Sequence, residues 1–175
     1  MEKNHLIIIG LIVVVIALVA GLAYTMAGNN LSGGGNAPDG MQKYDFNSEF
    51  KMNVPNNARF LKEWNYTDPT FGTGYSYLDK ENEFAVSFMN TPLITHEYIS
   101  NMVDTINKSG NATVEYEGDL IIGHNLKANG KVGNSLENTN FTEIVMIQNG
   151  HTMVTVSGND LDFIKSIINS IEFYE

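Results

Sequence analysis

The chain has 175 residues, a formal net charge of −10 at pH 7 and no cysteine. Without cysteine it can form neither a disulfide framework nor a cysteine-based zinc site. Its 20 acidic residues outnumber 10 Lys and Arg, whereas nucleic acids and anionic bilayer surfaces attract basic patches. We therefore expect no nucleic-acid partner.

The first element in the chain is an apolar run, residues 6–27, that contains no charged side chain. A helix of this length rises about 33 Å, which is enough to span a hydrocarbon core of about 30 Å. We predict that residues 6–27 form a retained transmembrane helix whose partner is the lipid bilayer. A signal peptide cleaved after the Thr-Met-Ala sequence at 25–27 is the alternative.

The residues that flank this run predict its orientation. Lys3 precedes it, and the next basic residue along the chain is Lys43. Because basic residues are retained on the cytoplasmic side, we expect residues 1–5 inside and residues 28–175 outside, as a single-pass protein of the cell membrane. Residues 28–43 are rich in Gly and nearly free of apolar side chains, so they are predicted to be a flexible tether.

Residues 44–175 are predicted to form one extracytoplasmic domain, a soluble monomer with its own core. Alternating apolar and polar residues predict strands, and apolar residues at helical spacing predict helices. In chain order, we expect a strand at 50–54, a short strand or irregular segment within 56–70, a hairpin of 75–77 and 84–88 around a turn at 79–82, a helix at 95–108, strands at 114–117 and 120–122, a turn at Asn129-Gly130, a hairpin of 144–147 and 153–156 around Asn149-Gly150, and a final helix.

Both helices carry residues that favour defined ends. Thr95 is expected to cap the first helix and Gly110 to end it, while Asn159 is expected to cap the final helix. Five apolar side chains of the final helix are expected to face a sheet: Leu161, Ile164, Ile167, Ile168 and Ile171. Antiparallel strands packed by helices define an α+β domain.

Three stretches of the domain resemble the PsbP-like α/β/α sandwich superfamily. They are Phe-Lys-Met-Asn-Val-Pro at 50–55, the Tyr-rich hairpin, and the segment 164–173 that runs from the last helix into Ser-Ile-Glu-Phe. The superfamily includes photosystem extrinsic subunits, a Ran-binding import factor and membrane-anchored prokaryotic proteins. The resemblance covers residues 44–174 and implies the sandwich fold. It implies no catalytic residue, because the superfamily shares none.

Three histidines of the domain, His96, His124 and His151, are candidate metal ligands together with Glu97 or Glu143. No two of them stand four residues apart on one helix or two residues apart on one strand, so we expect them to be exposed or hydrogen-bonded histidines. Ser157 with His151 lacks the Gly-x-Ser-x-Gly context of a nucleophile elbow.

Two acidic stretches are candidates for cation binding or acid-base chemistry. Residues 79–83 lack the Gly and Glu of a calcium loop at the sixth and twelfth positions, so they are interpreted as a hairpin turn. Glu115, Glu117 and Asp119 are expected to share one solvated strand face. We assign no catalytic, cofactor-binding or metal-binding residue.

Asn-x-Ser/Thr sequences, the acceptors of N-linked glycans, begin at five positions: Asn30, Asn65, Asn107, Asn111 and Asn140. Glycosylation would agree with a domain outside the membrane, and chance in an Asn-rich chain is the competing interpretation.

We expect a membrane-anchored extracytoplasmic binding or assembly module with an envelope protein as partner, and not an enzyme. One alternative is a surface hydrolase or metal-dependent enzyme, which requires that His124, His151 and the face of Glu115 and Glu117 converge on one pocket. The other is a purely structural surface protein.

Overall fold

The computed structural model describes residues 37–70, 72–110, 112–125 and 141–174. The predicted transmembrane run 6–27 and the turn expected at Asn129-Gly130 lie outside these ranges. Neither helix in the described part combines the length and the apolar character that crossing a bilayer requires.

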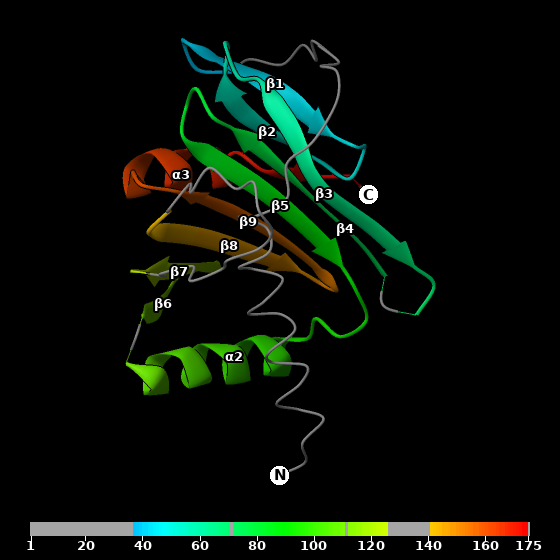
Figure 1. Ribbon diagram of the computed structural model, residues 1–175, viewed down its shortest axis with the longest axis vertical. Coiled ribbons are helices and arrows are strands. Elements are labelled where there is room, and N and C mark those ends of the chain that lie inside the picture. Colours follow the sequence, from blue (N-terminus) through cyan, green and yellow to red (C-terminus); the bar gives the residue numbers. More distant parts are fainter. Residues whose placement is uncertain (1–36, 71, 111, 126–140, 175) are drawn as a thin grey trace, which may run out of the picture.

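A seven-stranded antiparallel sheet forms the centre of the domain (Figure 1). Its strands lie in the order β3-β4-β5-β9-β8-β7-β6, so β5 and β9 are neighbours although the whole of α2 and β6 to β8 separates them in sequence. The bounds are β3 (Phe60–Asp68), β4 (Gly72–Asp79), β5 (Phe84–Asn90), β6 (Thr113–Glu117), β7 (Leu120–His124), β8 (Glu143–Asn149) and β9 (Thr152–Gly158).

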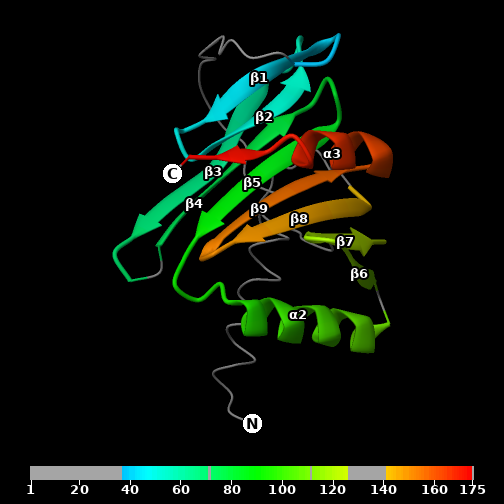
Figure 2. The ribbon, with the colours of Figure 1, turned by 180° about the vertical axis from the view of Figure 1, so that it is seen from behind.

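A second, three-stranded sheet packs on one face of the first. It contains β1 (Met41–Phe46), β2 (Phe50–Pro55) and β10 (Glu172–Phe173), in the order β1-β2-β10. Figure 2 shows β10 returning the C-terminal end of the chain to lie beside β2. The strand β1 begins at Met41, inside the predicted tether, because residues 41–43 pair with 53–55 of β2.

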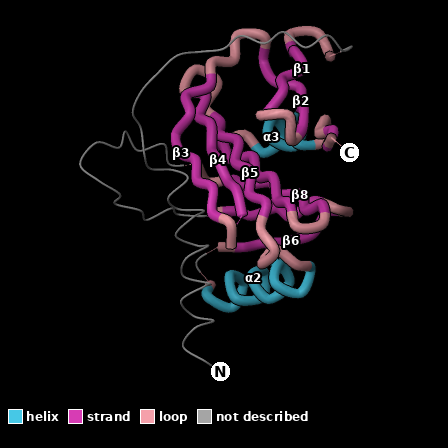
Figure 3. Tube along the Cα trace, turned by 90° about the vertical axis from the view of Figure 1, so that its right-hand side faces the viewer, coloured by secondary structure: helices cyan, strands magenta, loops and turns pink. Residues whose placement is uncertain are grey.

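The two helices lie on opposite faces of the large sheet (Figure 3). Successive residues of a strand point to opposite faces, and on β7 Ile121 packs with α2 (His96–Ser109) whereas Ile122 packs with α3 (Leu161–Ile168). The helices, the large sheet and the small sheet therefore enclose two separate hydrophobic clusters. This arrangement confirms an α+β domain of mostly antiparallel sheets.

The expected ends of α2 are confirmed. The Thr95 hydroxyl accepts a hydrogen bond from the backbone N–H of Tyr98, and Gly110 adopts a left-handed conformation with φ 69°. The prediction that Asn159 caps α3 was wrong. The side chain of Asp160 accepts the hydrogen bond from the backbone N–H of Phe163. Asn159 instead accepts a hydrogen bond from Thr142 N–H with its side-chain oxygen.

Three isoleucines of α3, Ile164, Ile167 and Ile168, are fully buried, as their helical spacing predicted. Ile171 lies beyond the end of α3 and packs on the same cluster from the segment that leads to β10. Residues 56–70, where a short strand or an irregular segment was predicted, contain the nine-residue strand β3. A β-bulge between Lys62 and Trp64 interrupts the period-two pattern there, which explains why the strand was not evident in the sequence.

Candidate functional site

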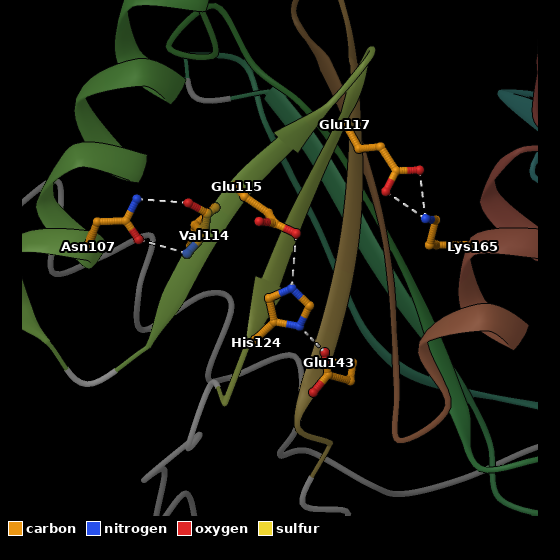
Figure 4. A network of polar contacts seen from close by, with 7 residues as sticks. All are labelled: Asn107, Val114, Glu115, Glu117, His124, Glu143 and Lys165. Carbon is orange, nitrogen blue, oxygen red and sulfur yellow. Dashed lines mark hydrogen bonds and ion pairs between the residues drawn. The ribbon is translucent and has the colours of Figure 1, made fainter.

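His124 is the centre of a charged cluster on the face of the sheet that carries α3. It ends β7, and the register places it opposite Glu143, the first residue of β8. Its Nδ1 lies 2.5 Å from Glu143 Oε2, and its Nε2 lies 3.5 Å from Glu115 Oε1 on β6 (Figure 4). The cluster therefore joins three neighbouring strands at the β6 edge of the sheet.

The two contacts of His124 favour its protonated form. A neutral imidazole has one N–H, whereas the imidazolium has two, and ionised carboxylates only accept hydrogen bonds. Only the imidazolium donates to Glu143 and Glu115 at the same time. The hydrogen bond with Glu143 is the main cause that raises the pKa of His124, and Glu115 raises it further against the opposing effect of burial.

The same geometry is unsuited to a metal ion. The carboxylates of Glu115 and Glu143 lie against different nitrogens of the ring, and these nitrogens point in different directions (Figure 4). One ion held by either nitrogen would therefore not meet both carboxylates. In the described ranges, no group of three or more His, Asp or Glu side chains is arranged to hold a metal.

The neighbouring carboxylate on the same face of β6 has a different partner. Both oxygens of Glu117 accept hydrogen bonds from Lys165 Nζ on α3, at 2.6 and 2.7 Å (Figure 4). Asp119 lies in the turn between β6 and β7 rather than on the strand face. The expected face of three carboxylates is therefore a face of two, each paired with a cation on another element.

The other two histidines lie away from this cluster. His151 is in the turn between β8 and β9, where its Nδ1 lies 2.9 Å from the backbone oxygen of Ile94. His96 is exposed at the first turn of α2. Ser157 lies near the far end of β9, which begins next to His151 and rises about 3.3 Å per residue, so these two residues do not form a nucleophile and base.

The acidic stretch at 79–83 is a turn, as predicted. The carboxylate of Asp79 is fully buried and accepts four hydrogen bonds, from the backbone N–H groups of Arg59, Glu81 and Asn82 and from the Asn82 side-chain amide. These donors occupy the carboxylate oxygens that a cation would need. Asp79 therefore holds the β4–β5 turn and the start of β3 together.

One residue that sequence reasoning missed covers the open edge of β6. The Asn107 side chain donates from Nδ2 to Val114 O at 2.8 Å, and its Oδ1 accepts from Val114 N at 2.7 Å (Figure 4). Asn107 thus offers one donor and one acceptor to the strand, as a neighbouring strand would. The only signal in the sequence was an Asn in the last turn of a predicted helix, followed closely by a strand.

Comparisons with models of known protein families, with curated proteins and with solved structures gave no match for this chain. The cluster is therefore interpreted from its geometry. It holds the His124 ring between two carboxylates and ties three strands together. Beside it, Lys165 lies against the Glu117 carboxylate and ties α3 to β6. Neither group holds a nucleophile beside a general base.

Proposed function

We propose that this chain is a non-catalytic binding or assembly module, anchored in the cell membrane by residues 6–27 and displayed outside the cell. One observation carries the proposal. Three of the polar residues that the sequence offered as candidates for chemistry make contacts that organise the fold: His124 joins three strands, Glu117 joins β6 to α3, and Asp79 holds a turn. A module of this kind acts through its surface.

The anchor and the acidic balance support the same proposal. A 22-residue apolar run without charge is long enough to span a bilayer, and the basic residue before it favours an outside position for the domain. A net charge of −10 keeps such a domain soluble and away from anionic lipid surfaces. An envelope protein is the kind of partner that this position provides.

The positions of the candidate catalytic residues argue against the enzyme alternative. It requires His124 and His151 in one pocket with Glu115 and Glu117. Within the described residues, His124 contacts Glu115 and Glu143, His151 contacts Ile94, and Glu117 contacts Lys165. His124 therefore contacts Glu115, whereas His151 and Glu117 each contact a different residue outside this set.

Cross-linking of the full-length protein in intact cells tests the proposal. The expected result is a cross-linked envelope protein that the wild type and a Glu115→Gln, His124→Gln double variant recover equally. The variant removes the charged cluster, so equal recovery separates surface binding from chemistry at the cluster. Absence of any cross-linked partner contradicts the module. Loss of the partner only in a variant that remains folded shows that the cluster itself acts.

Protease added to intact cells tests the position of the domain separately. Cleavage within residues 28–36, with release of the folded domain, is the expected result. Protection that ends only when cells are lysed would place the domain inside and would contradict the proposed display.

A further inference from the structure

Two of the five Asn-x-Ser/Thr sequences have an asparagine in the described part of the chain. These two asparagines differ in secondary structure and in hydrogen bonding. Asn65-Tyr66-Thr67 lies in β3, an edge strand of the large sheet. Asn107-Lys108-Ser109 lies in the last turn of α2. The transfer of a glycan to such a sequence requires a free asparagine amide and the hydroxyl two residues later.

In β3 both groups are available and lie together. Asn65 pairs with Tyr75 and Thr67 pairs with Thr73 of β4, so both are regular strand positions beyond the bulge. Residues two apart on a strand point to the same face, which places the Asn65 amide and the Thr67 hydroxyl side by side. Both residues are exposed, and neither side chain forms a hydrogen bond with another residue of the described ranges.

In α2 both groups are occupied and lie apart. The Nδ2 of Asn107, the atom that would receive a sugar, donates to Val114 O, and the Ser109 hydroxyl donates to Ile106 O at 2.6 Å. Residues two apart on a helix are separated by about 200° around its axis. A glycan on Asn107 would also remove the contact that covers the edge of β6.

We propose that Asn65 is a site of N-linked glycosylation and that Asn107 is not. The inference rests on the proposed display of the domain outside the membrane. The co-substrate is a glycan linked through phosphate to a polyprenyl lipid. Nδ2 of Asn65 forms a bond to the anomeric carbon of the first sugar, the bond from that carbon to the phosphate oxygen breaks, and the lipid phosphate leaves with the electron pair. The amide loses one proton, which neutralises one charge of the leaving lipid phosphate.

A glycan at this position gives the sheet a second covered edge. Unpaired edge strands are templates for pairing with other chains, and natural sheets protect them. Asn107 covers one end strand, β6, through Val114. The other end strand is β3, and a bulky hydrophilic group on Asn65 hinders the approach of another strand along it.

Mass spectrometry of the full-length protein, purified from the membranes of its own cells, tests the proposal. Trypsin releases residues 63–80 as one peptide, which contains Asn65 and no other Asn-x-Ser/Thr sequence. We expect a sugar mass increment on this peptide, complete loss of the increment in Asn65→Gln and Thr67→Ala, and its retention in Thr67→Ser. The matched control Ser109→Ala removes the second sequence without touching the Asn107 amide and is expected to leave the protein mass otherwise unchanged.

Protease accessibility measured on the same cells separates the two proposals. An unmodified 63–80 peptide from an externally accessible domain overturns the glycosylation site and leaves the proposed display intact. A protected domain with an unmodified peptide overturns both. A sugar increment on Asn107 overturns the exclusion of Asn107. An increment on 63–80 that persists in Asn65→Gln overturns the assignment to Asn65.

Discussion

The side-chain amide of Asn107 forms two hydrogen bonds with the backbone of Val114, one through each of its polar atoms. Asn107, in the last turn of α2, thereby provides hydrogen-bond partners for the backbone of Val114. This residue belongs to the edge strand β6, which pairs with a strand on one side only. Edge strands with unpaired backbone groups invite pairing with other chains, so this contact protects the β6 edge as well as holding α2 to it.

The first prediction concerns this contact. Asn107→Ala removes both hydrogen bonds and is expected to lower the free energy of unfolding by about 1–3 kcal/mol. The backbone N–H and C=O of Val114 would both lose their side-chain partner. Urea denaturation measures the loss, and hydrogen exchange is expected to accelerate at Val114. Asn101→Ala, an exposed position on the same helix, is the matched control. Equal losses in the two variants would show that Asn107 does not support β6.

The second prediction concerns the pH dependence of stability. His124 has a raised pKa in the folded protein, chiefly through its hydrogen bond with Glu143, with Glu115 as a further cause. Its contribution is therefore complete below the ordinary histidine pKa of about 6.5 and is lost as the pH rises through the folded pKa. The free energy of unfolding, measured by urea titration at several pH values from 6 upward, is expected to fall.

The control for this pH dependence is His124→Gln, which cannot titrate. We expect the variant to be less stable than the wild type at pH 6 and the difference to shrink as the pH rises. A constant difference between the two proteins over the whole range would contradict the role of the imidazolium between Glu143 and Glu115.

The third prediction concerns the buried face of α3. Ile168 is fully buried, and its truncation to Ala is expected to cost about 2–5 kcal/mol, a large part of the stability of an ordinary domain. Asn169→Ala, on the exposed side, is expected to change the melting temperature little. Lys165→Ala breaks a pair whose carboxylate partner, Glu117, is 57% exposed, so its cost is expected to be about 0–1 kcal/mol. Similar losses at positions 168 and 169 would contradict the observed packing.

The fourth prediction concerns where the domain begins. Residues 41–43 pair with β2, the Gln42 side chain donates to the backbone oxygen of Pro55, and Lys43 forms an ion pair with Glu172 of β10. We expect a fragment 37–175 to fold alone and a fragment 44–175 to melt at a lower temperature. Circular dichroism measures the melting temperature of each fragment, and hydrogen exchange shows whether each fragment is folded. Identical melting would assign residues 41–43 to the tether after all.

The helices and the hairpins could be predicted from the sequence because local chemistry specifies them. The side chain of Thr95 caps the turn that immediately follows it, Gly110 adopts the left-handed conformation that ends α2, and Gly150 supplies the positive φ of the β8–β9 turn. The spacing of Ile164 and Ile168 likewise places both on one buried stripe of α3. Each of these signals acts within a few residues.

The tertiary structure alone decided the strand β3, the small sheet and the charged cluster. A bulge between Lys62 and Trp64 breaks the alternation that identifies a strand, and β1 owes its place to pairing with β2 rather than to an apolar pattern. His124 meets Glu115 and Glu143 because the register of three strands brings their side chains to one face. The spacing of these residues along the chain does not indicate that register. Side chains from separate strands come into contact only after long-range pairing has fixed which residues stand opposite one another.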